Sequence, residues 1–308
     1  MSSAFISHED CLLHEMGEQH PERPARLLAI GKQLQQMGLN RALTRYDAPL
    51  AERSLLEAVH DSDYVNRLFA TAPEDALVWL DPDTAMCEHT LAAARRAAGA
   101  AVMAVDLVMT DQAKTAFCAV RPPGHHAEYG RAMGFCFFNN VAVGARHALN
   151  AYQLERIAIV DFDVHHGNGT QDIFAGDDRV LVCSSFQHPF YPHSGDDCQE
   201  RNILNLPLAA GSSGRDFRLA AKEKWLPALA EFAPQLIMIS AGFDAHRADS
   251  IAHLEFETED YAWITGKLIA QAVRSAEGRI VSTLEGGYEL SSLANSVATH
   301  LEVLQGSG

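Results

Sequence analysis

The chain has 308 residues, of which 47% are hydrophobic and 21% are charged, and its formal net charge at pH 7 is −16. The composition is typical of a globular protein, and the length allows one large α/β domain or two domains. Since no linker, repeat or low-complexity segment is found, we expect one domain over residues 1–308. The acidic balance argues against a nucleic-acid partner, because nucleic-acid binding needs a basic surface. No apolar run reaches ~18 residues and the first residues do not resemble a secretory signal, so we expect no membrane partner and a cytoplasmic location.

The first third of the chain predicts mainly helices. The apolar periodicity indicates a helix at 25–38, a strand at 43–46, one or two helices within 52–69 and a long Ala-rich helix at about 85–109. Residues 1–23 carry scattered polar side chains and predict no strand. We expect Asp81-Pro82-Asp83-Thr84 to form a turn that caps the long helix.

From residue 115 onward, predicted strands alternate with predicted helices. The strands are expected at 115–120, 157–162, 180–185, 235–240 and 279–284, and the helices at 139–152, 215–232, 258–275 and 291–304. This alternation predicts a three-layer α/β/α fold with a mainly parallel sheet. In such sheets the ligand site lies outside the carboxyl ends of the strands. The final Gly306-Ser307-Gly308 is expected to fray.

The stretch 157–169 is the most informative part of the chain. An apolar strand leads into Asp161, Asp163 and His165, which alternate onto one side of an extended backbone. Such groups are costly to bury unless a metal ion offsets their desolvation. Asp244 follows another predicted strand, and with Asp163 and His165 it makes three ligands that leave a coordination position open. This pattern is typical of a catalytic zinc site, although these hard ligands also suit Fe²⁺ or Co²⁺.

Other polar residues follow the ends of two further predicted strands. His125 and His126 come after a stiff Pro-Pro-Gly turn, and a histidine near a metal can move a proton from water to a leaving amine. Asp161 and Asn168 are natural hydrogen-bond partners for the two imidazoles. Tyr288 can donate its hydroxyl to a developing oxyanion. Singly these residues suit surface or core positions, but together they predict a metal-assisted amide or ester hydrolase.

These residues lie within five longer motifs, which read Arg121-Pro122-Pro123-Gly124-His125-His126, Met133-Gly134-Phe135-Cys136-Phe137-Phe138-Asn139-Asn140, Asp161-Phe162-Asp163-Val164-His165-His166-Gly167-Asn168-Gly169-Thr170, Ser240-Ala241-Gly242-Phe243-Asp244 and Leu284-Glu285-Gly286-Gly287-Tyr288. In this order they resemble the zinc-dependent histone deacetylase family. Asn168 and the run His20-Pro21-Glu22-Arg23-Pro24 are more similar to its class II branch, which includes bacterial histone deacetylase-like amidohydrolases.

The resemblance implies an arginase-like α/β fold and an enzyme that removes an acyl group from an amine. It implies that zinc is bound by Asp163, His165 and Asp244. His126 would be the general base and acid, His125 its electrostatic partner, and Tyr288 the group that polarises the carbonyl. A structural potassium ion is implied at Asp161, Asp163, His165 and Ser185, with a second near Phe174 and Val180. A homo-oligomer, dimer or tetramer, is also expected.

The resemblance further implies a narrow substrate tunnel. Phe135 and Tyr191 would form its walls beside Gly134, Asp81 would hold the substrate at the rim, and Arg23 would line an inner acetate cavity. Polyamine-specific relatives carry an acidic residue near the mouth, at the position that Ile251 takes here. This difference weakens a polyamine substrate without excluding it.

Three hypotheses remain open. In the first, the chain is a deacylase of acyl-lysine in peptides or proteins, or of a similar acylated amine. In the second, it is an amidohydrolase of acetylpolyamines or other small amides. In the third, it is a non-catalytic reader of acyl-lysine, which would require the three metal ligands to turn away from a common point.

Overall fold

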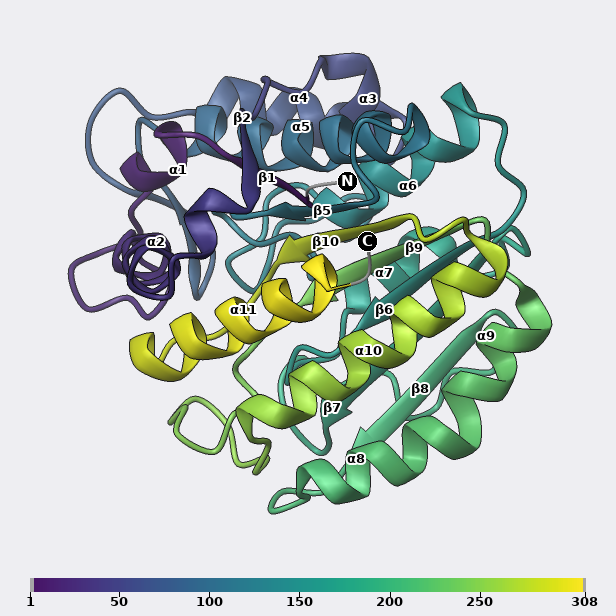
Figure 1. Ribbon diagram of the computed structural model, residues 1–308. Coiled ribbons are helices and arrows are strands. Elements are labelled where there is room, and N and C mark those ends of the chain that lie inside the picture. The colour runs from purple at the N-terminus through teal and green to yellow at the C-terminus, as the bar shows by residue number, and fades with distance from the viewer. Residues whose placement is uncertain (1–2, 307–308) are drawn as a thin grey trace.

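The structure is a computed structural model that describes residues 3–306, and one eight-stranded sheet forms its centre (Figure 1). The strand order is β2-β1-β5-β10-β9-β6-β7-β8, and every neighbouring pair is parallel. The strands are β1 (Ser3–Ser7), β2 (Leu43–Asp47), β5 (Thr115–Cys118), β6 (Ile157–Asp161), β7 (Val180–Gln187), β8 (Ile203–Leu208), β9 (Leu236–Ala241) and β10 (Ile280–Leu284). The predicted α/β fold with a mainly parallel sheet is confirmed.

Helices cover both faces of the sheet, because successive side chains of each strand point to opposite faces. In β6, Ile157 and Ile159 join one buried cluster, whereas Ala158 and Val160 join the other. The first cluster packs under α3 (Arg53–Glu57), α4 (Ser62–Thr71), α5 (Thr90–Met109), α6 (Asn140–Ala151) and α7 (Asn168–Phe174). The second packs under α2 (Ala25–Gln36), α8 (Gly214–Ala220), α9 (Leu226–Phe232), α10 (Thr258–Ser275) and α11 (Leu290–Gln305).

Two short helical pieces and one irregular turn complete these layers. The short helix α1 (Asp10–Leu13) follows β1, and a 3₁₀ turn at Leu39–Arg41 follows α2. The helix expected at 215–232 is present, but a π-helical turn at Ala221–Trp225 joins α8 to α9. Pro227 lies two residues after the end of this turn and has no N–H for a regular helical hydrogen bond, which accounts for the widened backbone.

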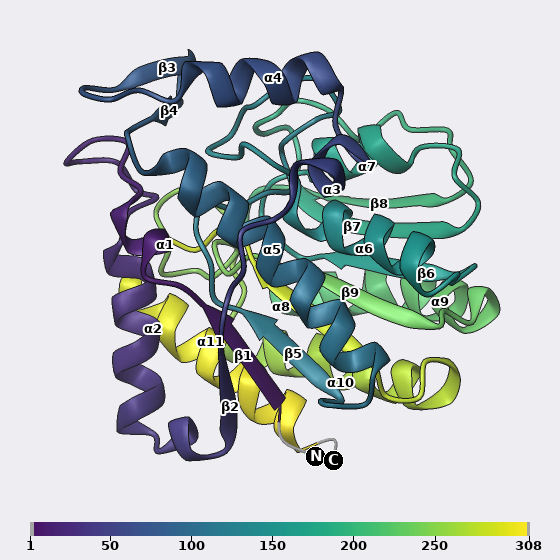
Figure 2. The same cartoon turned by 90° about the horizontal axis from the view of Figure 1, so that it is seen from above.

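The turn predicted at residues 81–84 is present, but the predictions that it caps the long helix and that this helix starts at about residue 85 are wrong. Residues Val78–Asp81 and Thr84–Met86 form an antiparallel hairpin, β3 and β4, so the turn between them belongs to the hairpin (Figure 2). The long helix α5 therefore begins at Thr90. The hydroxyl of Thr90 accepts a hydrogen bond from the backbone N–H of Cys87, which stabilises the turn before the helix.

Besides β3 and β4, two strands of the large sheet were not predicted. The first, β1, lies inside the sheet between β2 and β5, although only its central residues are strongly apolar. The second, β8, lies at the sheet edge, and it contains Pro207 and the half-exposed Asn205. A proline in an edge strand removes no ladder hydrogen bond on its solvent side, but it obscures the strand pattern in the sequence.

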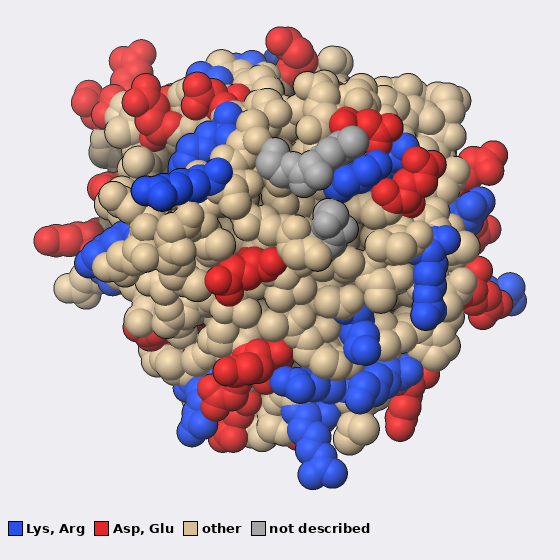
Figure 3. Space-filling model, viewed as in Figure 1, with Lys and Arg blue, Asp and Glu red and all other residues tan. Residues whose placement is uncertain are grey.

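Lys and Arg side chains are interspersed with Asp and Glu on the face shown in Figure 3. Within residues 3–306, no helix combines the length and apolar character needed to cross a membrane. Gly306 ends α11 through a hydrogen bond from its N–H to the carbonyl of Glu302. Ser307 and Gly308, for which fraying was expected, lie outside the described residues.

Candidate metal centre and active site

The polar residues that follow four separate strands meet at one place. They come after β5, β10, β9 and β6, which are adjacent in that order in the sheet. Because these strands are parallel, their carboxyl ends open onto the same edge. A cavity of about 200 Å³ lies there, and His125, His126, His165 and Tyr288 line it.

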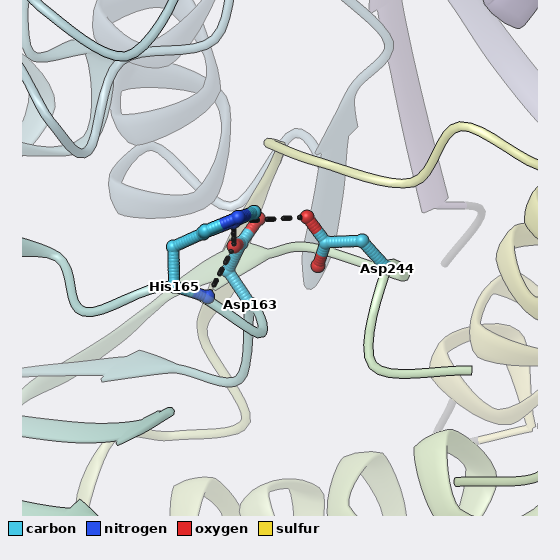
Figure 4. A group of neighbouring side chains, drawn as sticks. All are labelled: Asp163, His165 and Asp244. Carbon is cyan, nitrogen blue, oxygen red and sulfur yellow. Dashed lines mark hydrogen bonds and ion pairs between the residues drawn. The ribbon is translucent and has the colours of Figure 1, made fainter. Parts of the chain in front are cut away.

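Asp163, His165 and Asp244 form a compact buried group (Figure 4), and His165 of this group lines the cavity. One possible ligand atom from each lies within 4.8 Å of the others. Nδ1 of His165 is 3.0 Å from Oδ1 of Asp163 and 3.3 Å from Oδ2 of Asp244. The three predicted ligands are therefore brought together, and none turns away from a common point. However, β6 ends at Asp161, so Asp163 and His165 lie in the following loop and not on an extended strand as predicted.

The charges of this group suit a divalent cation. Oδ2 of Asp244 is buried and accepts no hydrogen bond within residues 3–306. Burial, followed by repulsion from Asp163, raises the pKa of Asp244 to about 6. Burial alone would lower the pKa of His165, but the adjacent carboxylates of Asp163 and Asp244 raise it to about 9. Close buried carboxylates with this little compensating charge are stabilised when a metal ion binds between them.

The backbone around the group fixes both carboxylates. The N–H of Gly286 donates to Oδ2 of Asp163 at 2.8 Å, and the N–H of Val164 donates to Oδ1 of Asp244 at 2.9 Å. A Cβ atom at Gly286 would collide with Oδ2 of both aspartates. Glycine is therefore required here for the close approach of the loop after β10 to the metal ligands.

The adjacent histidines have the two different partners that the sequence predicted. Nδ1 of His125 is 2.9 Å from Oδ2 of Asp161, and Nδ1 of His126 is 2.7 Å from Oδ1 of Asn168. Burial alone would lower the pKa of His125, but Asp161 and then Asp163 raise it well above its ordinary value. Burial, followed by the charge of His125, lowers the pKa of His126 well below its ordinary value. One imidazole is thus charged, and its neighbour is neutral and able to accept a proton.

Tyr288 lines the same cavity and is held from behind by a buried arginine. Burial, followed by the Asp244 carboxylate, raises the pKa of the Tyr288 hydroxyl well above its ordinary value, so it stays protonated and can donate. Nε of Arg26 donates to the carbonyl of Gly287 at 2.6 Å, and its Nη2 donates to the carbonyl of Glu285 at 2.5 Å. The Arg26 guanidinium lies 5.0 Å from the centre of the Tyr288 ring.

The prediction that Arg23 lines an inner cavity is therefore wrong. Arg23 is exposed and lies at a separate surface pocket beside Ile251. Arg26 is fully buried, and its Nη1 donates to Oε1 of the equally buried Glu22 at 3.0 Å. Glu22 lies before α2, which begins at Ala25, so no helical spacing in the sequence marked Arg26 as the inward arginine.

Aromatic side chains form the walls of the cavity, as predicted. Phe135, Tyr191 and Gly134 all line it, and Phe190, which was not predicted, lines it as well. The Phe190 ring stacks on His165 at 5.5 Å between centroids, and the Tyr191 ring meets His126 edge-on at 5.3 Å. The resulting passage is narrow and mostly apolar, which suits an extended methylene chain.

At the mouth of the cavity, Ile251 takes the position predicted for it, but the carboxylate is a different one. Asp83 lines the cavity, whereas Asp81 does not. Oδ1 of Asp81 accepts a hydrogen bond from the backbone N–H of Asp83 at 3.3 Å. The prediction of Asp81 as the rim residue is corrected to Asp83, because the hairpin turn between β3 and β4 carries Asp83 inward.

Glu285 is a buried part of the site that the sequence did not reveal. Its Oε2 accepts hydrogen bonds from the N–H groups of Gly124 and His125 at 2.7 and 3.1 Å, and its Oε1 accepts one from the hydroxyl of Ser240. Burial raises the pKa of Glu285 to about 7. This carboxylate ties the loop of the two histidines to the ends of β9 and β10.

Of the residues predicted to bind potassium, two lie on the neighbouring strands β6 and β7, and the carbonyls of two others accept hydrogen bonds from a side chain. Asp161 and Ser185 lie at or near the carboxyl ends of the paired strands β6 and β7. The carbonyls of Phe174 and Val180 both accept hydrogen bonds from the Asn202 amide, at 2.7 and 2.9 Å. Potassium binding stays a prediction.

Comparisons with known proteins agree with this geometry. A model of the histone deacetylase domain matches residues 20–304. The chain is 39% identical to an uncharacterized protein of Synechocystis sp., over 98% of this chain and 99% of that protein. It is 37% identical to a probable deacetylase of Archaeoglobus fulgidus, over 94% of this chain and 82% of that protein.

Two further relatives extend the comparison. The chain is 38% identical to the polyamine deacetylase HDAC10 of Mus musculus, over 99% of this chain but only 48% of that protein. Among solved structures, the crystal structure of the HDA15 HD domain matches with a TM-score of 0.92 and 35% identity, over 100% of this chain and 90% of that one. The chain therefore belongs to the histone deacetylase family, whose members are enzymes that hydrolyse acetyl-amides.

Proposed function

We propose that the chain is a zinc-dependent deacylase that hydrolyses the amide of acyl-lysine in peptides or proteins, or of a similar acylated amine. The observation that carries this proposal is the buried group of Asp163, His165 and Asp244, whose His165 lines the same cavity as His126 and Tyr288. The narrow apolar walls favour a substrate that presents its acyl group on a long, thin chain.

The metal ligands, the two histidines and Tyr288 each have a role in hydrolysis. A zinc ion at the three ligands would supply a Lewis acid that activates water and polarises the acyl carbonyl, and Fe²⁺ would suit the same ligands. His126 accepts a proton from the attacking water and later returns it to the leaving amine. The charged His125 stabilises negative charge beside it, and Tyr288 donates to the carbonyl oxygen as that oxygen becomes anionic. Water adds to the acyl carbon and the C–N bond breaks, which releases a carboxylate and a free amine.

The test is a metal-dependent assay on an acetyl-lysine peptide. We expect hydrolysis to stop after chelation and to return with one equivalent of zinc per chain. The variant His126→Ala is the matched control, because it should lose activity while it retains the metal. Full activity in chelated protein would refute the metal mechanism.

Acylated polyamines are the second candidate substrate. The Asp83 carboxylate at the cavity mouth supports them, because it would attract the free ammonium of a polyamine. Ile251 at the mouth opposes them. The ratio of kcat/KM for acetylputrescine to that for an acetyl-lysine peptide decides between the two substrates: a ratio of one or more favours the polyamine.

A further inference from the structure

The amide of Asn168 contacts His126 through one of its two ends, and the choice of end has a chemical consequence. Oδ1 of Asn168 is 2.7 Å from Nδ1 of His126. If oxygen faces the ring, Nδ1 must carry the proton and Nε2 is a free base. If the NH₂ group faced the ring, Nδ1 would be the free base and Nε2 would carry the proton. An imidazole that accepts a proton through Nε2 therefore requires the first orientation.

The groups behind Asn168 decide this orientation. Nδ2 of Asn168 lies 2.7 Å from Oε1 of Glu128 and 3.3 Å from Sδ of Met133. A carboxylate and a thioether can accept hydrogen bonds but cannot donate them. Both hydrogens of the amide are thus directed away from His126, and the amide oxygen is left to face the ring.

Glu128 is itself held by its backbone. Its N–H donates to the carbonyl of Arg131 at 3.0 Å, and its carbonyl lies 2.9 Å from Nδ1 of the buried His60. Nε2 of His60 accepts from the N–H of Asn139 at 2.9 Å, so Nδ1 of His60 carries the proton and donates to Glu128. These bonds fix the start of the Glu128 side chain, and Nη2 of Arg131 donates to Oε1 at 3.1 Å.

We propose that Glu128 is a positioning residue that selects the tautomer of His126 by orienting the amide of Asn168. Glu128 touches neither the substrate cavity nor the metal ligands, and it acts only through the polarity of two hydrogen bonds in series. This inference rests on the proposed role of His126 as proton acceptor, but its structural part, the link between residue 128 and the His126 tautomer, stands without it.

The kinetic test removes the donor–acceptor match between residues 128 and 168 and then restores the match with the opposite polarity. Glu128→Gln offers Asn168 either a donor or an acceptor, so the orientation is no longer selected. Since general base catalysis is worth roughly 10²–10⁴-fold, we expect kcat of the zinc-loaded enzyme to fall by about tenfold or more while KM changes by less than about threefold. Asn168→Asp alone places two carboxylates against each other and should also lose activity.

The double variant Glu128→Gln/Asn168→Asp makes the pair complementary again, because the new amide can donate to the new carboxylate while the latter accepts from His126. Compared at the pH optimum of each variant, its kcat should exceed that of either single variant. A merely structural role predicts that the two losses multiply, and that result would overturn the proposal. Arg131→Ala is the matched control: it removes an exposed contact of Glu128 without changing the polarity, and its kcat should stay within about twofold of the parent.

A second readout is independent of catalysis. In zinc-loaded protein labelled with [¹⁵N]histidine, NMR distinguishes the two neutral tautomers, and comparison with His126→Gln assigns the relevant signals. We expect His126 to be protonated at Nδ1 in the parent and to show both tautomers in Glu128→Gln. Protonation at Nε2 in the parent, or an unchanged tautomer in Glu128→Gln, would refute the proposal. An enzyme that proved inactive on all acyl-amines would refute the proposed function but leave this NMR test valid.

Discussion

Replacing Asp244 by Asn should have opposite effects on the metal-free and the metal-loaded protein. Burial and Asp163 raise the pKa of Asp244 from 3.8 to about 6. A carboxyl group whose pKa is raised by folding is less stable in its ionised form in the folded protein than in the unfolded chain. Each unit corresponds to about 1.4 kcal/mol, so the ionised side chain costs metal-free protein up to about 3 kcal/mol above that pKa. This cost is fully present above about pH 6 and disappears as the pH falls below 3.8, because Asp244 then becomes protonated in both states.

The assay is thermal unfolding of both proteins with chelator and with excess zinc. With chelator, Asp244→Asn should unfold at a higher temperature than the parent near neutral pH, by about 2–4 °C for each kcal/mol gained. The gain is smaller than the upper limit because the buried amide must find its own hydrogen bonds. At acidic pH the difference should vanish. Zinc should raise the unfolding temperature of the parent but not of the variant.

A buried carboxylate outside the metal group serves as control. Asp249 accepts hydrogen bonds from the N–H groups of Ile251, Tyr288 and Glu289. Asp249→Asn should therefore lose stability with and without zinc, by about 1–3 kcal/mol. Two results would contradict the role given to Asp244: an Asp244→Asn variant less stable than the parent in chelator near neutral pH, or equal stabilisation of parent and variant by zinc.

Three further outcomes are expected. Tyr288→Phe should reduce kcat by ~10²-fold or more with unchanged zinc content, since it removes one oxyanion donor, and loss of zinc would contradict that role. Arg26→Met should lower the free energy of unfolding by about 3–5 kcal/mol, because it removes a positive charge that compensates the buried Glu22 carboxylate. In the same denaturant titration, the control Arg23→Ala should change the free energy of unfolding by less than about 0.5 kcal/mol. Ile251→Glu should raise the acetylputrescine-to-acetyl-lysine ratio of kcat/KM by ~10-fold, about 1.4 kcal/mol of differential binding, and an unchanged ratio would remove residue 251 from substrate selection.

The side chains that support the catalytic residues show why local sequence patterns could not predict the whole site. Glu285 and Arg26 contact the loops of His125 and Tyr288 through backbone groups far away in the chain. A motif shows which residue types are present, but it does not show which backbone carbonyl or N–H each side chain reaches. For the same reason, the sequence alone did not show which of Arg23 and Arg26 is buried. Both are arginines of one short segment, and only the packing of α2 against the sheet buries Arg26.

The hairpin β3–β4 shows a second kind of limit. The residues between 81 and 84 do form a turn, as their types predict, but whether a turn precedes a helix or joins two strands depends on the pairing of the segments on either side of it. That difference moved the rim carboxylate from Asp81 to Asp83. The short strands β1 and β8 are likewise stabilised by their neighbours in the sheet and not by a strong pattern of their own.

The sequence by itself determined the strand–helix alternation, the family and the residue types of the metal group, because buried strands and metal ligands place strict demands on local composition. Only the tertiary structure decided which arginine is buried, which carboxylate reaches the cavity mouth and which partners orient His125 and His126. Those contacts join residues distant in the chain, such as His126 with Asn168 and Glu285 with Gly124, and they form only when adjacent parallel strands bring their ends together.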